Sequence, residues 1–111
     1  MAERKKVIIE RSSGNVFVDL KLPNPEERQA KVRLSVAINK IIDERGLTQA
    51  QAAKKLGVNQ PKVSALQNYK LSGFSLSRLM DFATALDQDV VIELRPKAKA
   101  KRPGQISVKA A

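Results

Sequence analysis

The sequence contains no cysteine, no histidine and no tryptophan in its 111 residues. Without cysteine and histidine there are no disulfide bonds, zinc fingers, thiolate or imidazole metal ligands, or nucleophiles that such side chains supply or activate. No apolar run approaches the roughly 20 residues that cross a bilayer, and the chain does not open on a secretory signal. We therefore expect a single-domain cytoplasmic protein with no metal, no cofactor and no membrane contact.

Negative charge is also scarce. Lys and Arg number 21 against 11 Asp and Glu, which gives a formal net charge of +10. The last 17 residues, RPKAKAKRPGQISVKAA, hold six basic residues and no acidic one. They have too few apolar groups to offset the entropy of ordering, so we predict a disordered basic tail over 95–111. Such a tail either aids solubility or binds phosphates without sequence preference.

A second stretch without acidic residues lies inside the expected folded region, from Arg45 through Met80. It holds six basic residues: Arg45, Lys54, Lys55, Lys62, Lys70 and Arg78. A single charge run is usually just a solvated helix face. An acid-free stretch that covers several consecutive elements is instead the electrostatic footprint expected where a nucleic-acid backbone binds.

Capping signals and apolar spacing predict four helices. The first runs over 25–45, with Asn24 as its cap, Pro25 at its first position and Glu27 completing a capping box. The second begins at Thr48, the third follows Asn59 and the fourth follows Ser75; glycines 46, 57 and 73 separate them.

Alternating apolar residues predict extended segments on both sides of these helices. Residues 90–94 alternate as a β-strand that Pro96 ends, and residues 15–22 also have an extended pattern. The fold class is therefore mainly α: a bundle of about four helices with a short C-terminal β-strand. We divide the chain into an extended flank over 1–23, a helical domain with its terminal strand over 24–94, and the basic tail over 95–111.

Residues 48–67, TQAQAAKKLGVNQPKVSALQ, have the spacing of a helix-turn-helix. Ala53 is small enough for a close helix crossing, Gly57 allows a tight turn, and Val63 can pack the second helix over the first. A purely structural helical hairpin would also use these residues. It would not need Gln, Asn, Lys and Ser on the exposed face of the second helix, so the pattern favours a helix that enters the major groove of DNA.

The segment from about residue 32 to 86 resembles the lambda-repressor-like, or XRE, class of helix-turn-helix domains. Within it, GLTQAQAAKKLGVNQPKVSAL and LSGFSLSRLM, with SSGNVFVDLKLPNPEE upstream, resemble the HigA-like antitoxins of type II toxin–antitoxin operons. The resemblance implies a homodimer on an inverted-repeat operator in double-stranded DNA, within the nucleoid. It also implies autoregulation and neutralisation of a RelE/HigB-like toxin by direct contact.

Matching positions give the candidate DNA-contacting residues. Gln49 stands where the family contacts phosphate and braces the first residue of the recognition helix, and Gln60 is that first residue, suited to a bidentate contact with adenine. Pro61 departs from the family, because many relatives have a hydrogen-bonding residue there and proline offers only apolar contact. The full candidate set is Thr48, Gln49, Asn59, Gln60, Pro61, Lys62, Ser64, Asn68 and Lys70.

Other functions fit the sequence less well. We expect no enzyme, because the acidic pairs at 43–44 and 87–89 have the positions of helix ends or turns and no phosphate loop is present. RNA binding fits the charge but not the scarcity of stacking aromatic residues. Two alternatives stay open: a stand-alone repressor, or an interaction protein whose 7–22 flank adds to a partner's sheet. That flank could equally pair with 90–94 of its own chain.

Overall fold

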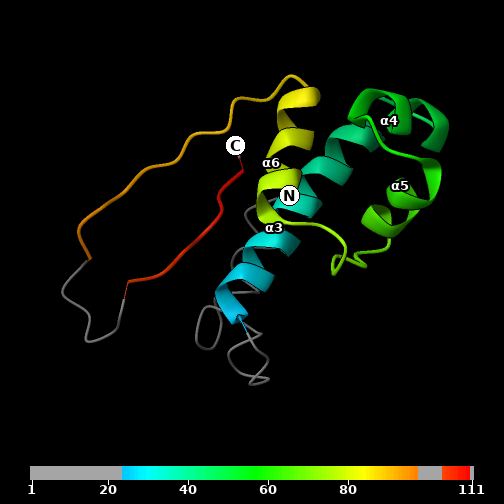
Figure 1. Ribbon diagram of the computed structural model, residues 1–111. Coiled ribbons are helices and arrows are strands. Elements are labelled where there is room, and N and C mark those ends of the chain that lie inside the picture. Colours follow the sequence, from blue (N-terminus) through cyan, green and yellow to red (C-terminus); the bar gives the residue numbers. More distant parts are fainter. Residues whose placement is uncertain (1–23, 98–103, 111) are drawn as a thin grey trace.

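Four helices follow one another in the residues that the computed structural model describes, 24–97 and 104–110 (Figure 1). They are α3 (Pro25–Glu44), α4 (Gln49–Leu56), α5 (Gln60–Gln67) and α6 (Leu76–Ala85). The mainly helical architecture and the four predicted helices are thus confirmed in this part of the chain. The long helix α3 packs against α5 and α6, and α4 packs against α5 and α6.

The core forms where the apolar faces of all four helices meet. Its largest fully buried apolar side chains are Ile38 and Ile42 from α3, Val63 and Leu66 from α5, and Leu79, Phe82 and Leu86 from α6 and its C-cap. The helix α4 adds Ala52, Ala53 and Leu56. Small residues dominate the α4 contribution, so that helix can approach its neighbours closely and leave its polar side in solvent.

Three of the four predicted helix caps are present. The side chains of Thr48, Asn59 and Ser75 each accept a hydrogen bond from a backbone N–H in the first turn of the helix that follows. The prediction for Asn24 is wrong: it has φ 50° and ψ 54°, and its side chain makes no capping hydrogen bond. The following Pro25 disfavours the right-handed helical region at residue 24, and asparagine tolerates the left-handed region that it occupies instead.

The ends of α3 and α6 are joined by one arginine. The Nη2 atom of Arg45 donates to the carbonyl oxygen of Leu86 over 2.7 Å, and its Nη1 atom lies 3.3 Å from Asp87 Oδ2. Gly46 follows with φ 64°, and its N–H donates to the Asp43 carbonyl, so α3 ends in the left-handed turn that its glycine predicts. This joint fixes the direction in which the chain leaves α6.

The prediction of a β-strand over 90–94 is wrong. No strand is present in the part of the chain that the structure describes; residues 88–97 run away from α6 without a ladder partner (Figure 1). Val91 is 83% exposed and Leu94 93% exposed, so the alternating pattern is not buried on either face of a sheet. Within this run, the hydrogen bond from Arg95 lowers the pKa of Glu93.

Residues 104–110 return toward α3. The backbone N–H of Ile106 donates to Glu26 Oε2 over 2.6 Å, and Arg33 Nη1 donates to the carbonyl oxygen of Val108 over 3.3 Å. Ile106 and Val108 belong to the predicted tail, and both contact α3. The boundary of the tail at residue 95 stays a prediction. The predicted extended segment 15–22 and the 1–23 flank lie outside the described residues. Among the described helices, none combines the length and apolar character that a bilayer span requires.

Candidate nucleic-acid interface

Capping residues set where α4 begins and ends and where α5 begins. Thr48 and Gln51 form a reciprocal capping box: Thr48 Oγ1 accepts from the Gln51 N–H over 3.1 Å, and Gln51 Oε1 accepts from the Thr48 N–H over 2.9 Å. Gly57 ends α4 with φ 73°, a conformation that costs a residue with a Cβ about 1–2 kcal/mol. Asn59 Oδ1 then accepts from the Lys62 N–H over 2.9 Å and starts α5. The chain therefore makes the predicted helix-turn-helix.

The helix α5 is buried along one side only. Val63 is fully buried and Leu66 is 1% exposed, and both side chains belong to the core. The first helical residues, Gln60, Pro61 and Lys62, are all exposed. The predicted recognition residues thus lie at the end of α5 that faces solvent, where no α3, α4 or α6 side chain covers them.

A residue outside the candidate set fixes the other end of α5. Asn39 Nδ2 on α3 donates to the Leu66 carbonyl over 3.1 Å, and thereby satisfies a carbonyl in the last turn of α5. Because α3 is the longest helix in the described residues, this bond sets the position of α5 on the largest element of the fold. The only sequence signal is an asparagine next to the core residue Ile38.

Gln49 has a different partner from the one that the resemblance implies. Its Nε2 atom donates over 3.0 Å to Oε1 of Gln67, at the C-terminal end of α5, and not to Gln60 at the start of that helix. Gln67 lies seven residues after Gln60 and therefore close to the same face of α5. Sequence reasoning missed Gln67, although this helical spacing could have indicated it. The expected contact between the side chains of Gln49 and Gln60 is therefore replaced by the one to Gln67.

Two of the candidate residues already serve the ends of α5. Asn59 is its N-cap, and Asn68 Nδ2 donates to the Ser64 carbonyl over 2.9 Å and lies 3.5 Å from Ser64 Oγ. Ser64 is half-buried, so its hydroxyl is less available than those of exposed residues. We conclude that Asn59, Ser64 and Asn68 shape the helix, and that Gln60 and Pro61 are its most available residues.

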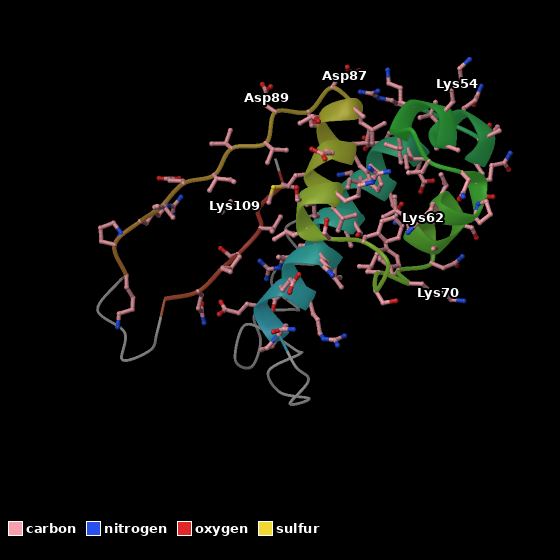
Figure 2. All side chains as sticks on the ribbon, in the orientation of Figure 1. Lys54, Lys62, Lys70, Asp87, Asp89 and Lys109 are labelled. Carbon is pink, nitrogen blue, oxygen red and sulfur yellow. The ribbon has the colours of Figure 1, made fainter. Side chains whose placement is uncertain are left out.

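Three lysines of the acid-free stretch lie around α4 and α5. Figure 2 shows Lys54, Lys62 and Lys70 on this side, whereas Asp87 and Asp89 lie beyond the far end of α6. Arg45, at the start of the acid-free stretch, instead pairs with Asp87 next to the end of α6. A polyanion that approaches the exposed side of α5 therefore meets the three lysines that Figure 2 labels there.

The comparisons with known proteins agree with this geometry. A family described as a helix-turn-helix domain matches residues 16–95. One solved structure, described as an XRE family transcriptional regulator, is 57% identical, covers 80% of this chain and 100% of its own, and superposes with a TM-score of 0.76. Among curated proteins, none matches. The family match spans all four helices, and the chain belongs to the XRE family of helix-turn-helix proteins.

Proposed function

We propose that this chain, as a DNA-binding transcriptional regulator of the XRE family, is a repressor that binds an inverted-repeat operator and is the antitoxin of its own toxin–antitoxin operon. The observation that carries the DNA-binding part is the exposed start of α5, with Gln60 and Pro61 uncovered beside a surface of lysines. A glutamine amide can accept from the N6 amine of adenine and donate to its N7 at once, and a proline ring can contact a thymine methyl group.

The geometry also supplies the positioning that base readout requires. Phosphate contacts fix the register of a protein on DNA, and base contacts then select the sequence. Lys54 and Lys55 on α4 and Lys70 after α5 are exposed and lie in the acid-free stretch of the sequence, so they can contact phosphates. These residues would contribute affinity at every sequence, whereas Gln60 would contribute the preference for one.

We propose a homodimer because a single recognition helix reads only a few base pairs. Two copies on half-sites about one helical turn apart would double the sequence that is read. The exposed run 90–94 is the segment that we assign to the contact between copies, since its backbone groups have no ladder partner among the described residues. An extended segment of β-branched residues gains most from such a partner strand.

The antitoxin role rests on the resemblance of 46–66 and 71–80 to HigA-like proteins, together with the flank that precedes the helices. A RelE/HigB-like toxin would be bound and neutralised by direct contact, and DNA binding would then regulate the operon. The second candidate function is a stand-alone repressor. It is favoured by the core, in which buried residues from all four helices pack together within one chain.

Two experiments test these proposals separately. The purified chain should bind the DNA fragment directly upstream of its own coding sequence, with at least about 10³-fold preference over random duplex. Binding to both fragments with equal affinity would contradict a specific repressor. For the antitoxin role, we expect a short basic reading frame next to this gene. Its product should arrest growth when it is expressed alone, and co-expression of this chain should restore growth. Failure to restore growth, with no complex on co-purification, would favour the stand-alone repressor.

A further inference from the structure

Lys62 is exposed on α5, but its ammonium group is already engaged inside the chain. Its Nζ atom donates to the carbonyl oxygen of Gly73 over 3.0 Å. The same atom lies 4.7 Å from the centroid of the Phe74 ring, within the range of a cation–π contact. Both partners belong to the loop between α5 and α6, so the side chain spans from one helix to the segment that leads into the next.

We propose that Lys62 is a positioning residue, which ties the recognition helix to the loop before α6, and that it does not bind a DNA phosphate. The proposal rests on the proposed function, because it concerns how α5 is held for DNA binding. Lysine at this place in a recognition helix would ordinarily be assigned to the DNA backbone as a point charge. The two contacts within the chain assign it a different task.

The aromatic ring that receives the ammonium group is itself fixed. Phe74 is 3% exposed and meets Phe82 edge to face, with ring centroids 5.8 Å apart and an interplanar angle of 77°. Phe82 is 1% exposed and belongs to the core of α6. A ring held in this way cannot turn to follow the lysine. The contact therefore holds the Lys62 side chain, and with it the first turn of α5, in place relative to the core.

The tie reaches a part of α5 that the other contacts leave free. Val63 and Leu66 hold the middle and end of the helix in the core, and Asn39 bonds to the carbonyl of Leu66. At the first turn, Gln60 and Pro61 are exposed and contribute nothing to the core. Lys62 is thus the side chain that links the proposed reading end of α5 to a neighbouring segment.

The ammonium group has little capacity left for DNA. It carries three N–H donors, one of which the Gly73 carbonyl accepts, while another part of the cation faces the ring. A phosphate would have to share the ammonium group with these two partners. Lys70 offers the comparison, because it is exposed and its side chain has no hydrogen bond or ion pair within the described residues.

The test compares Lys62→Met with Lys70→Met in the full chain. One measurement is the melting temperature without DNA. The other is the dependence of log Kd on log salt concentration for a random-sequence duplex of about 30 base pairs, since each phosphate contact contributes about 0.9 to that slope. We expect Lys62→Met to lower the melting temperature by about 4–8 °C and leave the slope unchanged. Lys70→Met should leave the melting temperature unchanged and make the slope smaller by about 0.9.

A third variant keeps the charge and disturbs only the tie. A Cβ atom at Gly73 would lie 3.1 Å from Lys62 Nζ, and Gly73 has no positive φ that would strain an alanine. Gly73→Ala should therefore displace the ammonium group, so its effect on the melting temperature should differ between the wild-type chain and Lys62→Met. Lys62→Arg should restore the melting temperature, because a guanidinium group can also donate to the carbonyl and stack on the ring.

The outcomes separate this proposal from the proposed function. A slope that falls by about 0.9 in Lys62→Met, or a melting temperature that Lys62→Met leaves unchanged, would overturn the positioning role. If the wild-type chain failed to bind duplex DNA, the proposed function would be overturned instead. The melting temperatures would in that case still decide whether Lys62 forms the tie.

Discussion

Tyr69 holds a conformation that its side chain disfavours. Its φ is 58°, in the left-handed region, and it directly follows the C-cap residue Asn68 of α5. Asp87 does the same after α6, with φ 66°. Glycine usually takes such places, because every other residue brings its Cβ close to the next carbonyl oxygen; asparagine and aspartate can offset part of this cost with a local hydrogen bond. These two residues allow the short helices α5 and α6 to end abruptly, at a cost in backbone energy.

This backbone cost predicts that the glycine and alanine variants of Tyr69 will have the opposite order of stability from the usual one. At ordinary positions, alanine is more stable than glycine by about 0.5–1 kcal/mol. At residue 69 we expect Tyr69→Gly to be more stable than Tyr69→Ala by about 1 kcal/mol, because only the alanine keeps the strained Cβ. Both variants lose the ring, which is 45% exposed, so their difference isolates the backbone. Urea unfolding measures both free energies, and an alanine variant as stable as the glycine variant would contradict the prediction.

Gln60 is the residue at which sequence reading should be tested. Replacing it with alanine removes the amide that can bond twice to adenine, so discrimination at one base pair should fall by about 1–3 kcal/mol. The measurement is a comparison of Kd over single-base variants of the bound upstream sequence. Gln105→Ala is the matched control, since this glutamine is exposed in the 104–110 segment. Unchanged affinity and specificity in Gln60→Ala would show that α5 does not read the groove through this residue.

The sequence predicts which residues are buried or exposed better than it predicts which residues contact one another. The exposure of Gln60 and the burial of Val63 follow from helical spacing, which relates residues three or four apart. The bonds from Gln49 to Gln67, Asn39 to Leu66 and Lys62 to Gly73 depend on how the helices cross. No local pattern in one sequence gives that crossing, so sequence reasoning predicted the buried and exposed positions of α5 and did not find the contacts between the helices.

At the scale of the element, the correct predictions of where helices begin rest mostly on capping residues. A hydroxyl or amide oxygen that accepts from the first turn acts within a few residues, so the sequence nearly suffices at Thr48, Asn59 and Ser75. A strand is different, because its hydrogen bonds go to another segment. The alternating run 90–94 has strand propensity, but within the described residues it has no segment to pair with.

Ser75 allows the value of one cap to be measured apart from DNA binding. Its Oγ atom accepts from the Arg78 N–H over 3.0 Å at the start of α6. Ser75→Ala should cost about 1 kcal/mol and lower the melting temperature by about 4–8 °C. Ser77→Ala is the matched control, because Ser77 is exposed inside the same helix and alanine is the better helix former. Equal melting temperatures for the two variants would argue against a working cap.

At the scale of the whole molecule, the uneven distribution of charge separates two kinds of binding. The helix-turn-helix presents a few basic residues in fixed positions, whereas residues 95–111 hold six basic residues and no acidic one. Fixed positions can select a sequence, because they set the register on the duplex. An arm that contacts only phosphates raises affinity for any sequence alike.

Deletion of residues 95–111 tests this division. Affinity for the upstream fragment and for random duplex should fall by similar factors. The slope of log Kd against log salt should fall by about 0.9 for each phosphate that the tail neutralises in the full chain. Because Ile106 and Val108 contact α3, the melting temperature is measured alongside. A truncated chain that lost only its specific binding would show that the tail takes part in sequence reading.

The proposed homodimer makes the most demanding prediction, because it assigns a role to a segment that the described chain leaves exposed. Val91 is 83% exposed, so proline there should not disturb the helices, but it removes a backbone N–H that a partner strand would need. The partner would be the same segment of a second copy, or residues 16–20 of either chain. Val91→Pro should therefore sediment as a monomer at micromolar concentration with unchanged helical circular dichroism. Val91→Thr, which keeps the donor and the β-branch, should remain a dimer. A wild-type monomer, or a proline variant that stays fully dimeric, would exclude this segment as the interface.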